Sequence, residues 1–195
     1  MTIRWLTTGT LLLVALLSSG CVPVILAGGV AATTTVIHDR RTAGEIIEDE
    51  AIEGRVKAAL GKDPELNEQS HINITSYDGV VLLSGETPTE AMRTRAGEIA
   101  RIQREVRRVH NELVVAAPSS LMTRTSDSLI TSRVKSALFG VKIEGFDPTR
   151  VKIVTENGTV YLMGMLYRAE AAAVTEQTRQ ISGVQRIVTL YQFLD

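Results

Sequence analysis

The stretch IEGRVKAAL occupies residues 52–60, and the stretch ITSRVKSAL occupies residues 130–138, with six identities in nine positions. In each stretch an isoleucine, a valine and a leucine recur every fourth residue, which places them on one face of an α-helix. Self-similarity at a fixed offset is typical of a structural repeat. The chain is therefore expected to contain one folding unit twice, and each copy opens with an amphipathic helix.

Two short strands and a tight turn follow each helix. Residues 72–83 alternate apolar and polar side chains around the turn Asp78-Gly79, and residues 151–162 do so around Asn157-Gly158. Such alternation predicts half-buried strands. Asp-Gly and Asn-Gly accept the positive φ angles of a two-residue hairpin turn, so a β-hairpin is expected in each copy.

A second helix and a closing strand complete each unit. Helices are expected over about 89–103 and about 168–181, and strands over 106–115 and 184–193. The predicted fold is α+β, with two tandem αββαβ units, each a three-stranded mixed sheet covered by two helices. The expected segments are a signal peptide (1–20), a lipidated N-terminus and tether (21–48), a first domain (49–115), a linker (116–126) and a second domain (127–195).

The N-terminus has the order of charge, apolar core and small residues that is typical of a signal peptide. Arg4 is the only charge before Asp39, and an apolar run over 11–17 leads to Ser-Ser-Gly and then to Cys21, the only cysteine. This ending resembles the bacterial lipobox, and the resemblance implies that Cys21 carries a diacylglyceryl group and a further acyl chain such as palmitate. The alternative is an ordinary secretory signal with an incidental cysteine.

The residues after Cys21 predict an address. Val22 and Pro23 follow the cysteine, where an aspartate tends to hold enterobacterial lipoproteins at the inner membrane. We therefore expect a lipid-anchored protein of the outer membrane that faces the periplasm. The Ala-, Gly- and Thr-rich segment that follows is expected to be a flexible tether, although its apolar residues 24–26 could also lie against the bilayer.

Composition and motifs argue against several functional classes. A formal net charge of −1 does not suit a nucleic-acid binder. The three histidines are scattered, without HExxH or paired metal-ligand spacing, and the chain has neither a phosphate loop nor a nucleophile elbow. We therefore expect no enzyme activity, no metal site, no cofactor and no nucleic-acid partner.

The duplicated unit resembles a known family. The stretch VTENG at 154–158, Met163-Gly164 and the run SGVQRIV at 182–188 resemble BON domains, and two such units behind a lipidated cysteine resemble the tandem BON lipoproteins associated with division and outer-membrane stress in Gram-negative bacteria. The resemblance implies a non-enzymatic role in outer-membrane integrity through contact with phospholipid.

Charge differs between the two copies. Residues 45–115 hold 9 basic and 14 acidic side chains, a net −5, whereas residues 119–195 hold 9 basic and 7 acidic ones, a net +2. Opposite charge adds to attraction at an anionic membrane surface. The second unit is therefore the better candidate to contact anionic phospholipid.

The opening helix of the second unit supplies the candidate lipid-binding residues. Leu129 stands where the first unit has only Ala51. We expect Leu129 to enter the acyl boundary, assisted by Ile130 or by Leu121 and Met122 in the preceding segment. Arg133 would then meet a phosphate and Asp127 would cap the helix, with Ser126 an equal candidate for the cap. Alternatively, Leu129 packs against the first unit or is a singly exposed leucine.

A second class of function stays open. The two units could form a periplasmic scaffold that binds an envelope assembly component or a cell-wall enzyme. A sheet edge over 109–115 could accept a strand from such a partner.

Overall fold

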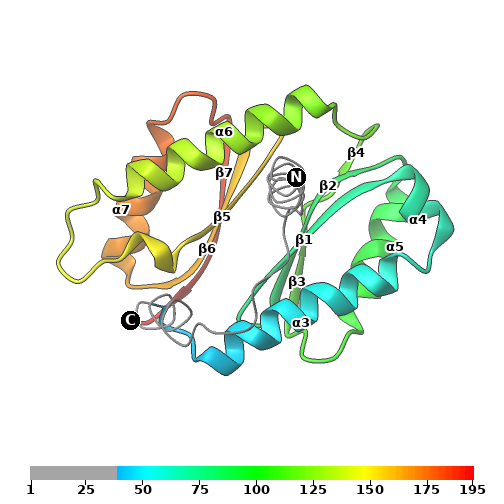
Figure 1. Ribbon diagram of the computed structural model, residues 1–195, viewed down its shortest axis with the longest axis horizontal. Helices are drawn as coiled ribbons and strands as arrows, with labels where there is room; N and C mark the ends of the chain where they lie inside the picture. Colours follow the sequence, from blue (N-terminus) through cyan, green and yellow to red (C-terminus); the bar gives the residue numbers. More distant parts are fainter. Residues whose placement is uncertain (1–38) are drawn as a thin grey trace, which may run out of the picture. The chain divides into compact units, whose positions relative to one another are not determined.

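The computed structural model describes residues 39–195, which contain two α+β repeats (Figure 1). The expected signal peptide, Cys21 and the tether up to residue 38 lie outside these described residues. Within 39–195, no helix combines the length and the apolar character that a membrane span requires. The predicted fold class of two tandem mixed units is confirmed.

The two repeats have the same succession of elements. The first contains α3 (Ala43–Leu60), α4 (Pro64–Gln69), β1 (His71–Tyr77), β2 (Val80–Thr87), α5 (Glu90–Arg101), β3 (Arg108–Asn111) and β4 (Val114–Val115). The second contains α6 (Leu121–Leu138), the short 3-10 helix η1 (Pro148–Arg150), β5 (Lys152–Glu156), β6 (Thr159–Leu166), α7 (Arg168–Arg179) and β7 (Arg186–Phe193).

Each sheet combines one antiparallel and one parallel pairing. The hairpins β1–β2 and β5–β6 are antiparallel, while β3 and β7 run parallel to β2 and β6. At both hairpin turns the two central residues have positive φ, 50° and 69° at Asp78-Gly79 and 46° and 70° at Asn157-Gly158. These angles are those of the predicted tight turns.

Three local features differ from the expectation. The opening helices begin earlier, at Ala43 and Leu121, so they include residues that were assigned to the tether and to the linker. The helix α4 was not predicted; Asp63 caps it and Pro64 occupies its first turn. The closing strand of the first repeat is interrupted at Leu113, whose amide hydrogen-bonds the Asn111 side chain at 3.4 Å.

The helices of each repeat cover one face of its own sheet. Figure 1 shows α3 and α5 along the sheet of β1, β2 and β3, and α6 and α7 along the sheet of β5, β6 and β7. The predicted helix stripes lie in these cores, with Ile52, Val56 and Leu60 in the first and Ile130, Val134 and Leu138 in the second. The helix-covered cores therefore follow the sequence pattern.

A third cluster joins the two repeats. Tyr77 and Leu82 of the first repeat pack with Tyr161 and Met163 of the second, and all four are buried. Leu82 in β2 and Tyr161 and Met163 in β6 alternate with residues of the helix-covered cores, so they come from the opposite faces of the two sheets. Each sheet is therefore buried on both faces, one side against helices and the other against the partner repeat.

Candidate functional site

The helix α6 has one buried face and one exposed apolar face. Ser120 caps the helix, its hydroxyl accepting a hydrogen bond of 3.2 Å from the Thr123 amide. Leu121, Met122 and Leu129 are 80%, 83% and 54% exposed. Met122, Leu129 and Arg133 follow one another at intervals of seven and four residues, so they form one stripe, and Leu121 flanks it at the first turn. The N-terminal half of α6 therefore presents large apolar side chains to solvent.

The matching face of α3 lacks this apolar surface. At the repeat offset of 78 residues, Leu121, Met122 and Leu129 correspond to Ala43, Gly44 and Ala51. An exposed leucine or methionine offers several methylene and methyl groups that an alanine or glycine does not. The two helices thus share their core residues but differ in their exposed apolar residues.

The arginine at the end of the stripe also differs between repeats. In α3, Arg55 forms an ion pair of 2.6 Å with Glu48. In α6, position 126 is a serine, and exposed Arg133 makes only a long hydrogen bond of 3.4 Å to the Ser182 carbonyl. Within residues 39–195 no carboxylate is seen to pair with Arg133, so its guanidinium is available to an anion.

Two of the predicted site residues lie elsewhere. Asp127 was expected to cap the helix, and this is wrong: it lies in the second turn, buried, and accepts hydrogen bonds of 2.9 Å from the Asn157 and Gly158 amides. Ile130 is also buried, with its side chain in the core of the second repeat. Both side chains therefore hold the repeat together, while Leu129 and Arg133 face solvent.

The first repeat has an equivalent aspartate with more partners. Asp49 is buried and accepts hydrogen bonds from the Asp78 amide at 2.6 Å and the Gly79 amide at 2.9 Å. Burial alone would raise the pKa of Asp49, but hydrogen bonds from Ser76, Gly79, Asp78 and Arg41 together lower it below its ordinary 3.8. Each buried aspartate thus fastens its helix to its hairpin turn.

The segment before α3 carries two arginines that sequence reasoning missed. Arg40 donates to both carboxylate oxygens of Glu170, at 2.7 and 2.8 Å, and to the Met165 carbonyl. Arg41 pairs with Asp49 at 2.8 Å and lies 3.9 Å from the ring centre of Tyr77. The only sequence signal was a pair of arginines after a long segment that has little charge. This segment therefore fastens to both repeats.

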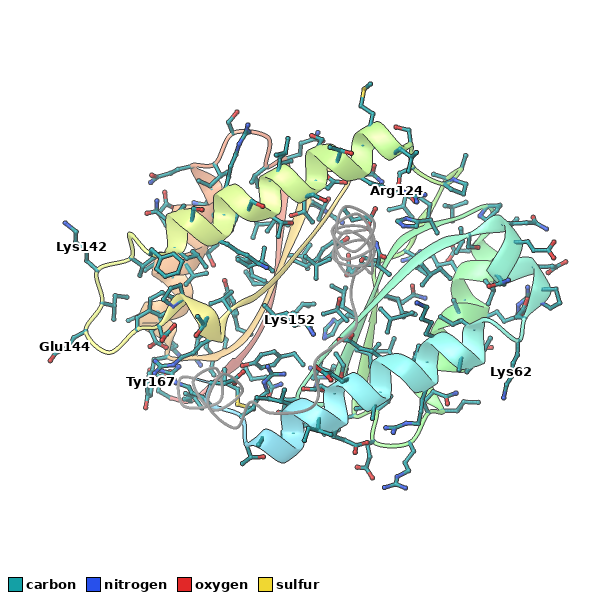
Figure 2. All side chains as sticks on the ribbon, in the orientation of Figure 1. Lys62, Arg124, Lys142, Glu144, Lys152 and Tyr167 are labelled. Carbon is teal, nitrogen blue, oxygen red and sulfur yellow. The ribbon has the colours of Figure 1, made fainter. Side chains whose placement is uncertain are left out.

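Two hollows flank the opening helix of the second repeat. One, of about 550 Å³, lies beside its N-terminal half and is lined by Met122, Ser126, Gly158 and Gln185 among others. The other, of about 520 Å³, is lined by residues of both repeats, including Lys135, exposed Phe139 and Lys152. Lys152, labelled in Figure 2, donates to Glu53 at 2.8 Å and to the Ser76 carbonyl at 3.1 Å. Only the first hollow borders the stripe itself.

Known proteins resemble this chain over most of its length. The BON domain model matches residues 48–117 and 126–193. Outer membrane lipoprotein DolP of Haemophilus influenzae is 35% identical over 177 residues, which cover 90% of each chain. The 21 kDa hemolysin of Actinobacillus pleuropneumoniae is 35% identical over 156 residues, 80% of this chain and 79% of the relative. Two family matches on the two repeats, together with identity across both, show that this chain belongs to the BON-domain family, as a tandem-BON lipoprotein.

Proposed function

We propose that the chain is a non-enzymatic lipoprotein of the outer membrane, anchored through Cys21 and facing the periplasm, whose second repeat binds anionic phospholipid and supports outer-membrane integrity. The observation that carries the proposal is the exposed stripe of Met122, Leu129 and Arg133, because the otherwise matching helix α3 has glycine and alanine in place of its two apolar members. The name of the Haemophilus relative, an outer membrane lipoprotein, supports the address.

The chemistry of the stripe suits the boundary between headgroups and acyl chains. Burial of one leucine in an apolar phase contributes about 1.5–3 kcal/mol. A cation near an anionic surface adds about 1 kcal/mol. Arg133 follows Leu129 by one helical turn, so the leucine can enter the acyl region while the guanidinium contacts a phosphate. Contact of this size is weak alone, but an acyl anchor raises the effective concentration of membrane around the helix.

Vesicle binding of the unlipidated chain, residues 22–195, tests the lipid contact. We expect binding to phosphatidylglycerol vesicles and little binding to phosphatidylcholine vesicles. Leu129→Glu should weaken binding at least about tenfold, because it removes buried apolar area and adds a repelled charge. The melting temperature should change by less than about 2 °C, since Leu129 is more than half exposed.

The matched control is Ile47→Glu. Ile47 is an exposed isoleucine of α3, 68% accessible, in the acidic first repeat. This variant should bind vesicles like the parent chain. Equal losses in Ile47→Glu and Leu129→Glu would contradict a specific role for α6.

The lipid anchor has its own test. Radiolabelled palmitate should be incorporated into the full-length chain in cells and should be absent from Cys21→Ala. Incorporation into the Cys21→Ala chain would contradict lipidation at this residue.

A protein-binding scaffold is the second candidate function. The edge strand β4 keeps Val114 and Val115 49% and 46% exposed, and such an edge can pair with a strand from a partner. A scaffold would retain an envelope protein in pull-down after Leu129→Glu and lose it after Val114→Pro. In a lipid-binding protein, Leu129→Glu would disturb the localisation of the chain and Val114→Pro would not.

A further inference from the structure

A polar cluster lies where the two repeats meet. It consists of His71 at the start of β1, Glu86 near the end of β2 and Glu156 at the end of β5. The His71 Nδ1 atom is 3.3 Å from a Glu86 oxygen and 3.7 Å from a Glu156 oxygen. One nitrogen and two carboxylate oxygens of the three residues all lie within 4.8 Å of one another.

The two carboxylates are buried and have mainly neutral partners. Glu86 is 1% exposed and Glu156 is 5% exposed. Glu86 accepts hydrogen bonds from the Asn157 side chain and, at 3.1 Å, from the Ser119 amide, while Glu156 accepts one of 2.6 Å from Asn73. Within the described residues neither carboxylate forms an ion pair with a lysine or an arginine, and the basic partner of both is His71. The cluster is therefore short of positive charge.

An unsatisfied hydroxyl faces the same region. Ser84 Oγ is fully buried and has no hydrogen-bond partner. Ser84 precedes Glu86 by two residues in β2, so both side chains point to the same face of the sheet, and it pairs in register with Asn73. A buried hydroxyl without a partner costs about 1–3 kcal/mol, which indicates that a water or another ligand belongs beside it.

The cluster has access to solvent. A cavity of about 260 Å³ is lined by His71, Asn73, Glu156 and Arg124 among others. Figure 2 labels Arg124 near the start of α6, and its Nε atom donates to Ser119 Oγ at 3.3 Å. The cavity gives a small ion and its water a route to His71 and Glu156, which line it.

We propose that His71, Glu86 and Glu156 bind a divalent transition-metal ion, Zn²⁺, that links the two repeats. Imidazole nitrogen and carboxylate oxygens are its usual ligands, and three protein ligands leave a coordination position for water. Separations of 3.3 and 3.7 Å between ligand atoms suit ligands that share one ion at about 2.0–2.2 Å. The Asn73 and Asn157 side chains would orient the carboxylates from behind.

The proposed site occurs once, because the repeats differ at these positions. At the repeat offset of 79 residues, His71 corresponds to Arg150, Glu86 to Met165 and Glu156 to Tyr77. Two ligands come from the first repeat and one from the second, so only their contact assembles the set. A bound ion therefore stabilises the arrangement of the two repeats as well as each hairpin.

Zinc titration of the full-length chain, purified in detergent and stripped with a chelator, tests the site. Calorimetry should show one saturable Zn²⁺ per chain, and ZnCl₂ should raise the melting temperature. Both isosteric variants Glu86→Gln and Glu156→Gln should bind zinc at least about 100-fold more weakly, because loss of a direct ligand exceeds the loss of an outer contact. His110→Gln, a change to a histidine outside the cluster, should bind zinc like the parent chain.

Folding and metal binding are separated by melting each variant without metal. Neutralising a buried carboxylate should leave the metal-free chain as stable as its parent or more so, since it removes repulsion. Zinc binding that is absent from the parent chain, or that persists in both glutamine variants, would overturn the proposal. If the metal-free variants were more stable and the parent chain did not respond to zinc, the two carboxylates would only repel each other and the proposal would be wrong.

Discussion

The two opening helices α3 and α6 have the same length, the same buried stripe and the same buried aspartate, yet their exposed faces differ. At the matching positions the first has only alanine and glycine beside an arginine that is paired with Glu48, whereas the second exposes Leu121, Met122 and Leu129 beside an arginine that has no carboxylate partner within residues 39–195. The shared positions include the core stripe and the aspartate that binds the hairpin turn, and also an arginine (Arg55, Arg133) and a lysine (Lys57, Lys135) outside the core. The positions that diverged are solvent-facing, where a substitution costs little stability and can change what the surface contacts.

The largest difference between the repeats is expected at two matching glycines. Gly85 has a φ of 115°, and an added Cβ would lie 2.0 Å from the His71 carbonyl oxygen. At Gly164 the Cβ would lie 2.8 Å from the Arg150 carbonyl oxygen, and no positive φ adds strain. Gly85→Ala should therefore destabilise by about 4 kcal/mol and Gly164→Ala by about 2 kcal/mol, measured by urea unfolding. Equal losses would contradict the distinction.

The buried aspartates are expected to give the next largest difference. Asp49 pairs with Arg41 and also accepts three hydrogen bonds, whereas Asp127 accepts bonds from two hairpin amides. Asp49→Asn should cost about 3 kcal/mol at neutral pH and Asp127→Asn about 1–2 kcal/mol. The measurement is urea unfolding of each variant beside its parent.

Urea unfolding at low pH tests whether the charge of Asp49 causes the cost of Asp49→Asn. Because the folded-state pKa of Asp49 is lowered, the carboxylate stabilises the fold above its ordinary pKa of 3.8, and this stability is lost as the pH falls through the folded value. The cost of Asp49→Asn should therefore shrink as the pH falls below about 4. A cost that stayed constant down to pH 2 would assign the effect to shape rather than to charge.

The smallest expected effect concerns the turns before β3 and β7. Glu105 has a φ of 63° where the second repeat has Gly183 at 98°. A side chain in this left-handed region costs about 1–2 kcal/mol. Glu105→Gly should therefore stabilise the chain by about 0.5–1 kcal/mol, because the glycine's extra freedom in the unfolded chain offsets part of the gain. A lower melting temperature would show that Glu105 makes contacts that outweigh its strain.

Much of the fold could be predicted because its signals are local. The four-residue spacing from Ile52 to Leu60 gives a helix face, and Asp-Gly and Asn-Gly give hairpin turns whose positive φ angles are observed. Helix beginnings were less predictable. Ser120, rather than Ser126 or Asp127, caps α6, since several polar residues precede the apolar stripe and only the folded chain selects one.

The candidate site was predictable in part. Comparison of the repeats located Leu129 and Arg133 on an exposed face, but it also named Ile130 and Asp127, which are buried. An aspartate among polar residues just before an apolar helix stripe has the sequence pattern of an N-cap. Its use as an acceptor for two amides of a distant hairpin is a long-range contact that has no local pattern.

The sequence by itself determined the duplication, the alternation of helix and strand and the charge contrast, because each of these depends on residues that are close together in the chain. Only the tertiary structure decided which faces of the sheets meet and that Arg40 fastens to Glu170. It also brought His71, Glu86 and Glu156 together. These contacts join residues far apart in the sequence, and their geometry depends on how two separately predictable units pack against each other.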